Sequence, residues 1–393
     1  MRLLLITENY PPDRGGMAES CDRIVRGLTR EGVAMDLVHF DRRCSASSHR
    51  TTSFGSLTRV AAEADAAHTI NLLWNRVQQT IDTARITHVV AFGGAMPMLS
   101  APVFAAWMAR PLVTLIRGNE LDAGLFDPRR RPILDDALRR SAAVCTVTAE
   151  QADKVSALHP ETTTHVVANG IDFDLWEATD AEVARAREWR ARNVDPGHRV
   201  LGIFGHLKSK KGVPFFIEAL RRSSVADRFH LLLAGEVEEA VKEIDIAHTM
   251  LPPMDRLDLI PYYLASDLVV LPSHYDGFPN VLIEAAALGR PCIASNVGGM
   301  RDLLTDGENA FLFAAGNEHA CREAIERVAD AGEDTLRRMG DSAATVARLR
   351  CDAHDEARHY VQVFQTAQED FDANADHHRH VVPAPRRLSW RAG

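Results

Sequence analysis

The chain has few cysteines, and they lie far apart. Six occur in 393 residues, at positions 21, 44, 145, 292, 321 and 351, and none belongs to a Cys-x2-Cys pair. Such spacing argues against a zinc site or a disulfide framework, and it is consistent with a reducing cytosol. We therefore expect a cytoplasmic protein without either kind of cross-link.

An excess of positive charge is also lacking. The formal net charge is −9 at pH 7, from 45 lysines and arginines against 54 aspartates and glutamates. That balance gives no electrostatic case for binding nucleic acid or an anionic membrane, although local basic clusters could still matter. We therefore expect no nucleic-acid partner.

Long apolar segments are nearly absent. The first one stops at Glu8, before the core of a signal peptide could form, and is typical of a β-strand. Only residues 89–109 are long enough to span a bilayer, and two glycines and two prolines interrupt them. The pattern favours a strand, a glycine turn and a buried helix, so we predict no transmembrane segment and leave peripheral membrane contact open.

What the chain does have is an alternation of short apolar strands with amphipathic helices, which is typical of doubly wound parallel sheets. Its length exceeds what one hydrophobic core usually organises, so we predict an α/β protein with two domains, at residues 1–176 and 177–351. A closing helix is expected at 352–371. Residues 372–393 show no periodicity, and we expect a disordered tail there.

The segment from Pro272 to Ala285 carries the strongest functional signal. It follows an apolar strand and opens a helix, with Asp276 in the loop and Glu284 about one turn into the helix. The residues between the two acids are Gly277, Phe278, Pro279, Asn280 and Val281. Their backbone N–H groups and the helix dipole suit an anion such as a diphosphate, and ionised carboxylates suit hydroxyls. The alternative is a surface loop with ordinary acidic residues.

A basic loop lies about seventy residues upstream. Residues 205–212 hold three lysines, among them Lys211, and connect an apolar strand to an amphipathic helix. Open parallel sheets bind ligands at the carboxyl ends of their strands, where this loop is expected. We interpret it as a phosphate contact, with a solvated basic loop as the alternative.

Near the amino terminus, Gly15 and Gly16 end a loop and open a helix. Glycine lets the backbone approach a ligand closely. A dinucleotide site would need Gly-x-Gly-x-x-Gly directly after the first strand, and that pattern is absent. The pair therefore favours another phosphate-bearing ligand.

Taken together, these motifs resemble those of the retaining glycosyltransferases of family 4. The matching segments are residues 11–17, 169–172, 211–212, 284–291 and 296–299, together with the acid pair Asp276 and Glu284. They occur in the family's order and with its spacing, from about residue 5 to about residue 315.

The resemblance implies the GT-B fold, two Rossmann-like domains facing a central cleft, with the closing helix crossing back to the first domain. It implies hexosyl transfer with retention from a nucleoside-diphosphate sugar, UDP-sugar favoured, to a hydroxyl of a small-molecule or glycan acceptor. No metal and no other cofactor would be needed. Gly15, Gly16 and Lys211 would contact the diphosphate, Glu284 the ribose and Asp276 the transferred sugar. Lys211 and Asp276 would also be catalytic.

The chain also departs from the family pattern. Asp276 stands where the family usually has glutamate, and His206, a further donor contact, stands where it usually has arginine. Where the family often has a histidine facing the acceptor, this chain has Arg117, followed by Asn119 and Glu120. We interpret these three as acceptor contacts, with Arg117 also catalytic. The alternative for Arg117 is a buried ion pair with Glu120 or Asp122.

Two other functions stay open from the sequence. A cofactorless sugar-nucleotide epimerase would share the fold but would need acid and base groups at the sugar ring, and none is evident. A protein that binds sugar nucleotides without turning them over is the second alternative, because Asp276 and His206 replace usual residues.

Overall fold

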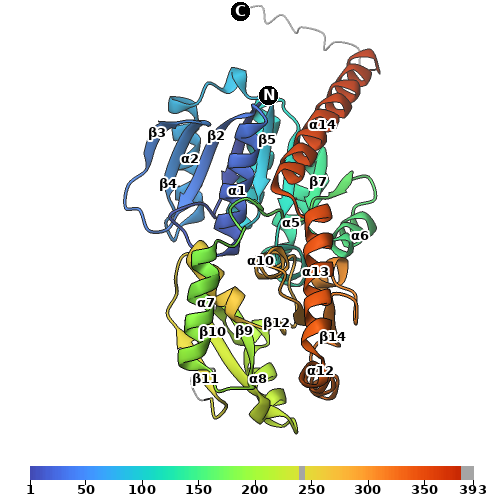
Figure 1. Cartoon of the computed structure of the whole chain (residues 1–393). Coiled ribbons are helices and arrows are strands. Elements are labelled where there is room, and N and C mark those ends of the chain that lie inside the picture. The colour runs from blue at the N-terminus through green and yellow to red at the C-terminus, as the bar shows by residue number, and fades with distance from the viewer. Residues whose placement is uncertain (239–243, 382–393) are drawn as a thin grey trace, which may run out of the picture.

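The computed structural model describes residues 1–238 and 244–381, and it consists of two α/β domains (Figure 1). Each domain is built on its own largely parallel sheet. The first sheet has the strand order β3-β4-β2-β1-β5-β6-β7-β8, and the second has the order β11-β10-β9-β12-β13-β14. This architecture agrees with the predicted pair of doubly wound domains.

The first sheet is parallel except for the antiparallel pair β3 and β4 at its edge. Its strands are β1 (Arg2–Thr7), β2 (Ala34–Asp41), β3 (Ser48–Thr52), β4 (Gly55–Ala61), β5 (His88–Phe92), β6 (Leu112–Ile116), β7 (Ala143–Thr146) and β8 (Thr164–Val166). Its helices are α1 (Gly16–Arg30), α2 (Ala66–Thr80), α3 (Ala95–Met108), α4 (Glu120–Phe126), α5 (Arg131–Arg140) and α6 (Ala149–Leu158). Because β1 lies between β2 and β5, the strand order reverses beside β1, where such sheets bind ligands.

The second sheet is parallel throughout. Its strands are β9 (Arg199–Leu207), β10 (Phe229–Val237), β11 (His248–Leu251), β12 (Leu268–Leu271), β13 (Cys292–Ser295) and β14 (Ala310–Phe313). Its helices are α7 (Asp180–Asn193), α8 (Val213–Arg221), α9 (Ile260–Ala265), α10 (Asn280–Ala287), α11 (Gly298–Leu303), α12 (Glu318–Asp330) and α13 (Glu333–Arg350). The order reverses between β9 and β12, and the basic loop and the acid-pair loop follow these two strands.

Helix α1 shows how the pattern of the sequence produces this packing. Cys21, Ile24, Val25 and Leu28 recur at helical spacing, and all four are buried against the first sheet. The helix begins at Gly16, so its amino terminus points from the first domain towards the carboxyl ends of the strands of the second (Figure 1). The apolar stripe thus fixes where the glycine pair lies.

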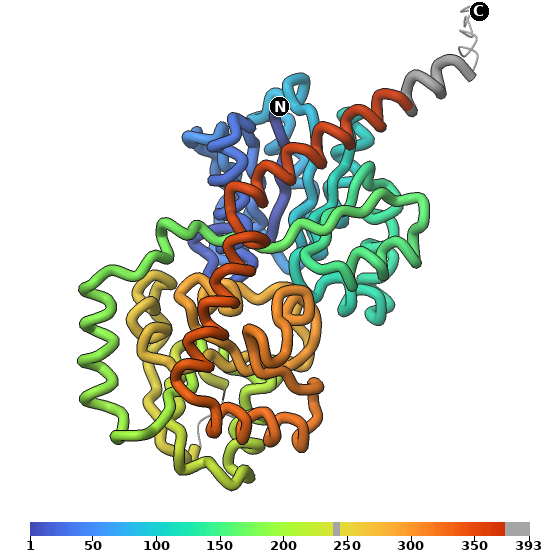
Figure 2. The backbone as a smooth tube through the Cα atoms, turned by 45° about the vertical axis from the view of Figure 1, so that its right-hand side comes forward, coloured from blue at the N-terminus to red at the C-terminus, as the bar shows by residue number. Residues whose placement is uncertain are grey.

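Helix α14 (Ala353–Val381) crosses back to the first domain and lies along it in both views (Figures 1 and 2). Tyr360, Val363, Phe364 and Ala367 are buried in the core that also holds β1 and α1. The helix continues ten residues past the predicted end at 371, to Val381. The remainder of the predicted tail, 382–393, lies outside the described residues.

Helix α3 corresponds to the long apolar segment of the sequence. One face is buried, including Met98, Ala101 and Phe104, but Val103 and Trp107 on the other face are 54% and 43% exposed. The prediction of a buried helix is therefore only half right. Within the part of the chain that the structure describes, no helix combines the length and the hydropathy needed to cross a bilayer.

Candidate functional site

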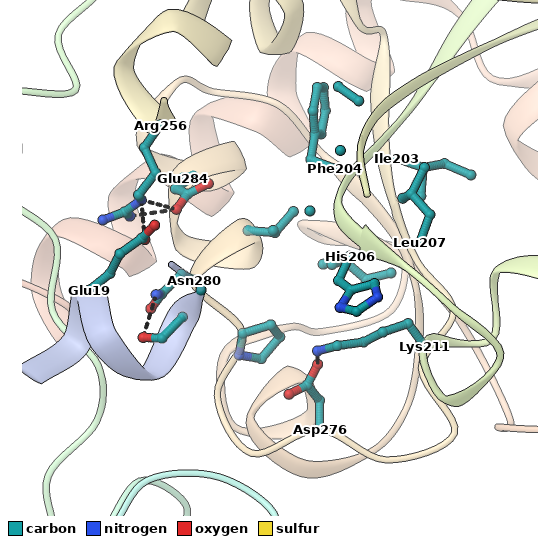
Figure 3. A pocket seen from close by; sticks show the side chains of 18 of the residues that line it. Glu19, Ile203, Phe204, His206, Leu207, Lys211, Arg256, Asp276, Asn280 and Glu284 are labelled. Carbon is teal, nitrogen blue, oxygen red and sulfur yellow. Dashed lines mark hydrogen bonds and ion pairs between the residues drawn. The ribbon is translucent and has the colours of Figure 1, made fainter. Parts of the chain in front are cut away.

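A cavity of ≈ 550 Å³ lies between the two domains. It is lined by the beginnings of α1 and α10, by the ends of β9, β10 and β12, and by the loops that follow these strands. Figure 3 shows Lys211, Asp276 and His206 on one side and Glu284, Arg256 and Glu19 on the other. The cavity therefore lies at the switch point of the second sheet and faces the glycine pair of the first domain.

The structure brings most of the predicted donor residues to this cavity. Those that line it are Gly15, Gly16, His206, Lys211, Asp276, Phe278, Pro279, Asn280, Val281 and Glu284. Gly277 does not line it. Its Cα faces the first domain, where an added Cβ would lie 3.3 Å from the carbonyl oxygen of Arg117. Gly277 therefore helps the loop between β12 and α10 (residues 272–279, the donor loop) to approach the first domain.

Lys211 and Asp276 form an ion pair at one end of the cavity. Their side chains are 35% and 17% exposed, so both remain accessible to a ligand. Lys211 ends a single 3₁₀ turn before α8, and this turn carries its ammonium group over the donor loop. An incoming phosphate would share or displace the carboxylate of Asp276 as the partner of Lys211.

Glu284 marks the opposite end and is only 3% exposed. The guanidinium of Arg256 donates to its Oε1 from Nε at 2.8 Å and from Nη2 at 2.5 Å, and the hydroxyl of Tyr263 donates to Oε2 at 2.6 Å. Arg256 also pairs with Glu19 of α1 at 2.8 Å. The sequence analysis missed Arg256, Tyr263 and Glu19, and no local motif marks them, because their contacts join segments far apart in the chain.

The glycine pair lies beside the start of α10. The side-chain amide of Asn280 donates to the carbonyl oxygen of Gly16 at 3.4 Å, so the amino termini of α1 and α10 approach each other across the cleft. Gly15 has φ +111°, a backbone conformation that favours glycine. Two helix amino termini in one cavity make a favourable environment for an anion.

His206 is exposed at the edge of the cavity. Its Nδ1 lies 3.9 Å from Glu236 Oε2, the carboxylate beside it on β10. This separation is beyond hydrogen-bond length, so His206 is free to turn towards a ligand.

Arg117 belongs to the lining of the cavity, but its side chain is nearly buried. Its side chain is only 1% exposed and pairs with Glu356 of α14 at 2.9 Å. It also donates to Asn169 Oδ1, to the hydroxyl of Tyr360 and, at 3.2 Å, to the carbonyl oxygen of Val167. Its side chain thus forms a buried ion pair, though with neither of the predicted partners Glu120 and Asp122, and its role as a catalytic or acceptor residue stays a prediction.

Unlike Arg117, Asn119 and Glu120 do not line the cavity. The carboxylate of Glu120 accepts a hydrogen bond from the backbone N–H of Arg117 at 2.6 Å, and burial raises the pKa of Glu120 above its ordinary value. Asn119 precedes α4 without capping it through its side chain. The structure thus gives Glu120 a role in shaping the loop after β6.

Comparisons with known proteins follow the same division into two halves. A family model described as "Glycosyltransferase Family 4" matches residues 14–175, and one described as "Glycosyl transferases group 1" matches residues 198–331. The chain belongs to the group 1 glycosyltransferases of family 4. The family resemblance stated from the sequence motifs is therefore confirmed.

Curated relatives of this family 4 protein share less than a third of their residues with it. A D-inositol 3-phosphate glycosyltransferase of Mycobacterium sp. (strain KMS) is 29% identical over 59% of this chain and 54% of its own length. The lipopolysaccharide core biosynthesis mannosyltransferase LpsB of Rhizobium meliloti is 28% identical over 51% of this chain and 60% of its own. The matches thus span little more than half of these relatives.

Solved structures match nearly the whole chain. Sucrose-phosphate synthase from Thermosynechococcus elongatus has a TM-score of 0.76 at 17% identity, covering 95% of this chain and 99% of that one. Anabaena Alr3699/HepE in complex with UDP-glucose has a TM-score of 0.75 at 19% identity, covering 93% and 100%. At such identities the likeness concerns the fold alone, and it confirms the predicted GT-B architecture.

No three His, Cys, Asp or Glu side chains lie close enough together to hold a metal ion among those that the structure describes. Asp172, which begins an Asp-x-Asp sequence, pairs instead with Arg30 at 3.3 Å. Metal independence stays a prediction for this family 4 protein.

The donor loop packs directly on Gly298, which allows a test of its role. Gly298 has φ +50°, and a Cβ there would lie 1.8 Å from the carbonyl oxygen of Asp276. Gly298→Ala must therefore strain the backbone and shift the loop that carries Asp276. Since about 1.4 kcal/mol is a factor of ten in affinity and such strain costs about 1–3 kcal/mol, we expect donor affinity to fall about ten-fold or more in calorimetry.

The matched control for this substitution is Gly307→Ala. Gly307 has a similar φ of +79°, but no atom lies within 4 Å of an added Cβ. It should lower stability slightly and leave donor affinity unchanged. Equal donor affinity in Gly298→Ala and the wild-type protein would show that the position of this loop does not govern binding.

Proposed function

We propose that this protein is a retaining, metal-independent glycosyltransferase that moves a hexosyl group from a nucleoside-diphosphate sugar to a hydroxyl of a small-molecule or glycan acceptor. The observation that carries the proposal is the single cavity in which Lys211, Asp276 and Glu284 of the second domain face Gly15 and Gly16 of the first. A cation and two helix amino termini suit a diphosphate, and the carboxylates suit the hydroxyls on either side of it.

The residues of the cavity suggest how the donor would lie. Glu284 would accept hydrogen bonds from the ribose, and Lys211, with the starts of α1 and α10, would hold the diphosphate. Asp276 would then accept hydrogen bonds from the transferred sugar. Negative charge develops on the leaving diphosphate as its bond to the sugar breaks, and Lys211 is placed to stabilise that charge.

Retention of configuration would follow if the acceptor hydroxyl attacks the sugar on the same face from which the diphosphate departs. Neither Asp276, which is paired with Lys211, nor Glu284, which is bound by Arg256 and Tyr263, is a free base. The leaving phosphate itself would accept the proton of the acceptor hydroxyl. Isolation of a covalent sugar adduct on Asp276 would contradict this mechanism and favour double displacement.

The substrates are proposed by class. UDP-sugars are favoured as donors, since one structure with a similar fold is described in complex with UDP-glucose. Relatives named for inositol phosphate and for lipopolysaccharide core suggest an acceptor rich in hydroxyl groups. Both family models are described as glycosyl transferases, which favours neither an epimerase nor a non-catalytic binder.

A thermal-shift screen over UDP-, GDP- and ADP-sugars tests the proposal. A ligand at a hundred times its dissociation constant stabilises the folded protein by about 2.7 kcal/mol, so the right donor should raise the melting temperature clearly. The best donor is then incubated with candidate polyols and sugars, and NMR reports the anomeric configuration of the product. Absence of any shift would contradict nucleotide-sugar binding, an inverted product would contradict retention, and loss of activity in EDTA would contradict metal independence.

A further inference from the structure

Arg256 lies between two carboxylates that belong to different domains. Its Nε is 2.8 Å from Glu19 Oε2 on α1 of the first domain, and its Nη2 is 2.5 Å from Glu284 Oε1 on α10 of the second. Figure 3 shows the three side chains converging at one end of the cavity. One guanidinium therefore connects the first domain to the carboxylate proposed to hold ribose.

The hydrogen bonds at Glu284 leave room for a ligand on one side only. Oε1 accepts both N–H groups of Arg256, and Oε2 accepts the hydroxyl of Tyr263. A carboxylate has about four acceptor positions, so Oε2 keeps one for a further donor. Arg256 and Tyr263 thus set the plane of the carboxylate and direct its remaining acceptor site.

The surroundings hold Arg256 in place. Its guanidinium lies 5.3 Å from the centre of the Trp176 ring, a cation–π contact in the segment that leads from the first domain to the second. Burial opposes its charge, but Glu284 and Glu19 raise the pKa of Arg256 above its ordinary value. The side chain is therefore a fixed cation whose position depends on both domains.

We propose that Arg256 is a positioning residue that couples the placement of the first domain to nucleotide binding by the second. Glu19 draws the guanidinium towards α1, and the guanidinium orients Glu284 for the ribose. This inference rests on the proposed function, since it assumes that Glu284 receives a nucleotide. It adds two residues, Glu19 and Arg256, that no motif of the sequence marks.

Isothermal titration calorimetry of UDP, GDP and ADP against the full chain tests the coupling. Arg256→Ala leaves a nearly buried carboxylate without its cation, and the nucleotide that the wild-type protein binds should bind at least about five-fold more weakly. Glu19→Gln should weaken it in the same direction but less. Because Glu19 acts through Arg256, the double variant should bind like Arg256→Ala alone, and additive losses would overturn the inference.

Two further variants separate positioning from general structural damage. Arg256→Lys keeps one charge without the planar fork and should recover part of the affinity, since lysine can reach only one carboxylate well. Asp22→Asn removes an acid from the same helix whose partner, Arg26 at 2.9 Å, is exposed, and it should leave the affinity unchanged. Melting curves verify that each variant is folded.

The outcomes distinguish the inference from the function on which it rests. If the wild-type protein binds a nucleotide and folded Arg256→Ala binds it equally well, the coupling is refuted while the proposed function stands. If the wild-type protein binds none of the three nucleotides, the proposed function fails, and the inference fails with it.

Discussion

Lys211→Ala should lower turnover by about a hundred-fold to a thousand-fold, the usual cost of removing one group that stabilises charge in the transition state. The fold should survive, because the side chain is 35% exposed and its one ion pair joins it to Asp276 at the edge of the cavity. We therefore expect the melting temperature to change little. Steady-state kinetics with the best donor, together with thermal melting, measure the two effects.

The reason for this large effect is that, among the lysines that the structure describes, no other shares the position of Lys211. Lys208 also lines the cavity, but Lys211 alone of the loop is paired with the acid of the donor motif. Without it, the charge that develops on the leaving diphosphate would be met by helix amino termini and by His206. A neutral imidazole donates one hydrogen bond and carries no charge, so it would compensate poorly.

Lys210→Ala is the matched control, since it removes the same charge from the adjacent position, which does not line the cavity. It should retain most of the turnover. Equal losses in both variants would mean that the loop acts through its total charge. Wild-type turnover in Lys211→Ala would contradict the assignment of the diphosphate site.

The fold could be predicted because each strand and helix carries its pattern locally. Buried parallel strands such as β12, and β5 after its first residue His88, are uninterrupted apolar segments, and the helices between them have one apolar face. The antiparallel edge strand β3 was missed because most of its residues are exposed and polar. Helix α7 carries little apolar signal for a similar reason: among its residues only Ala186 is buried.

For the site as well, residues that a local pattern fixes could be predicted, and contacts between distant segments could not. Lys211, Asp276 and Glu284 were predictable because strand ends and helix starts fix them, and the sheet topology then brings them into one cavity. The partners of Arg117 and Arg256 were not predictable, because each is chosen by packing between distant segments. Glu356 is 239 residues from Arg117, and Glu19 lies in the other domain from Arg256.

Glu356→Gln should lower the free energy of unfolding by about 3–5 kcal/mol, the usual cost of removing one partner from a buried ion pair. Glu356 accepts hydrogen bonds from Arg23 at 2.8 Å, from Arg117 at 2.9 Å and from the backbone N–H of Gly170 at 3.1 Å. The side chains of Arg23 and Arg117 are only 7% and 1% exposed, so neither can recover its hydration when the carboxylate is lost. Chemical unfolding at neutral pH measures the change.

The control for this variant is a substitution of Asp355, which lies next to Glu356 on the same turn of α14. Asp355 is exposed and pairs only locally, with Arg358, so Asp355→Asn should leave the unfolding midpoint unchanged. Equal stability of Glu356→Gln and the wild-type protein would mean that the desolvation cost of burying these charges cancels the attraction between Glu356 and the two arginines.

The pH dependence of the folding stability provides a second, independent test of the cluster formed by Glu356, Arg23 and Arg117. Burial alone would raise the pKa of Glu356, but Arg23 and Arg117 outweigh it and hold the pKa below its ordinary value. A carboxyl group with a lowered pKa in the folded state stabilises the protein above its unfolded pKa of about 4.3 and loses that contribution as the pH falls through the folded value. The wild-type protein should therefore lose stability more steeply on acidification below about pH 5 than Glu356→Gln does, and parallel curves would show that Glu356 carries no charge in the folded protein.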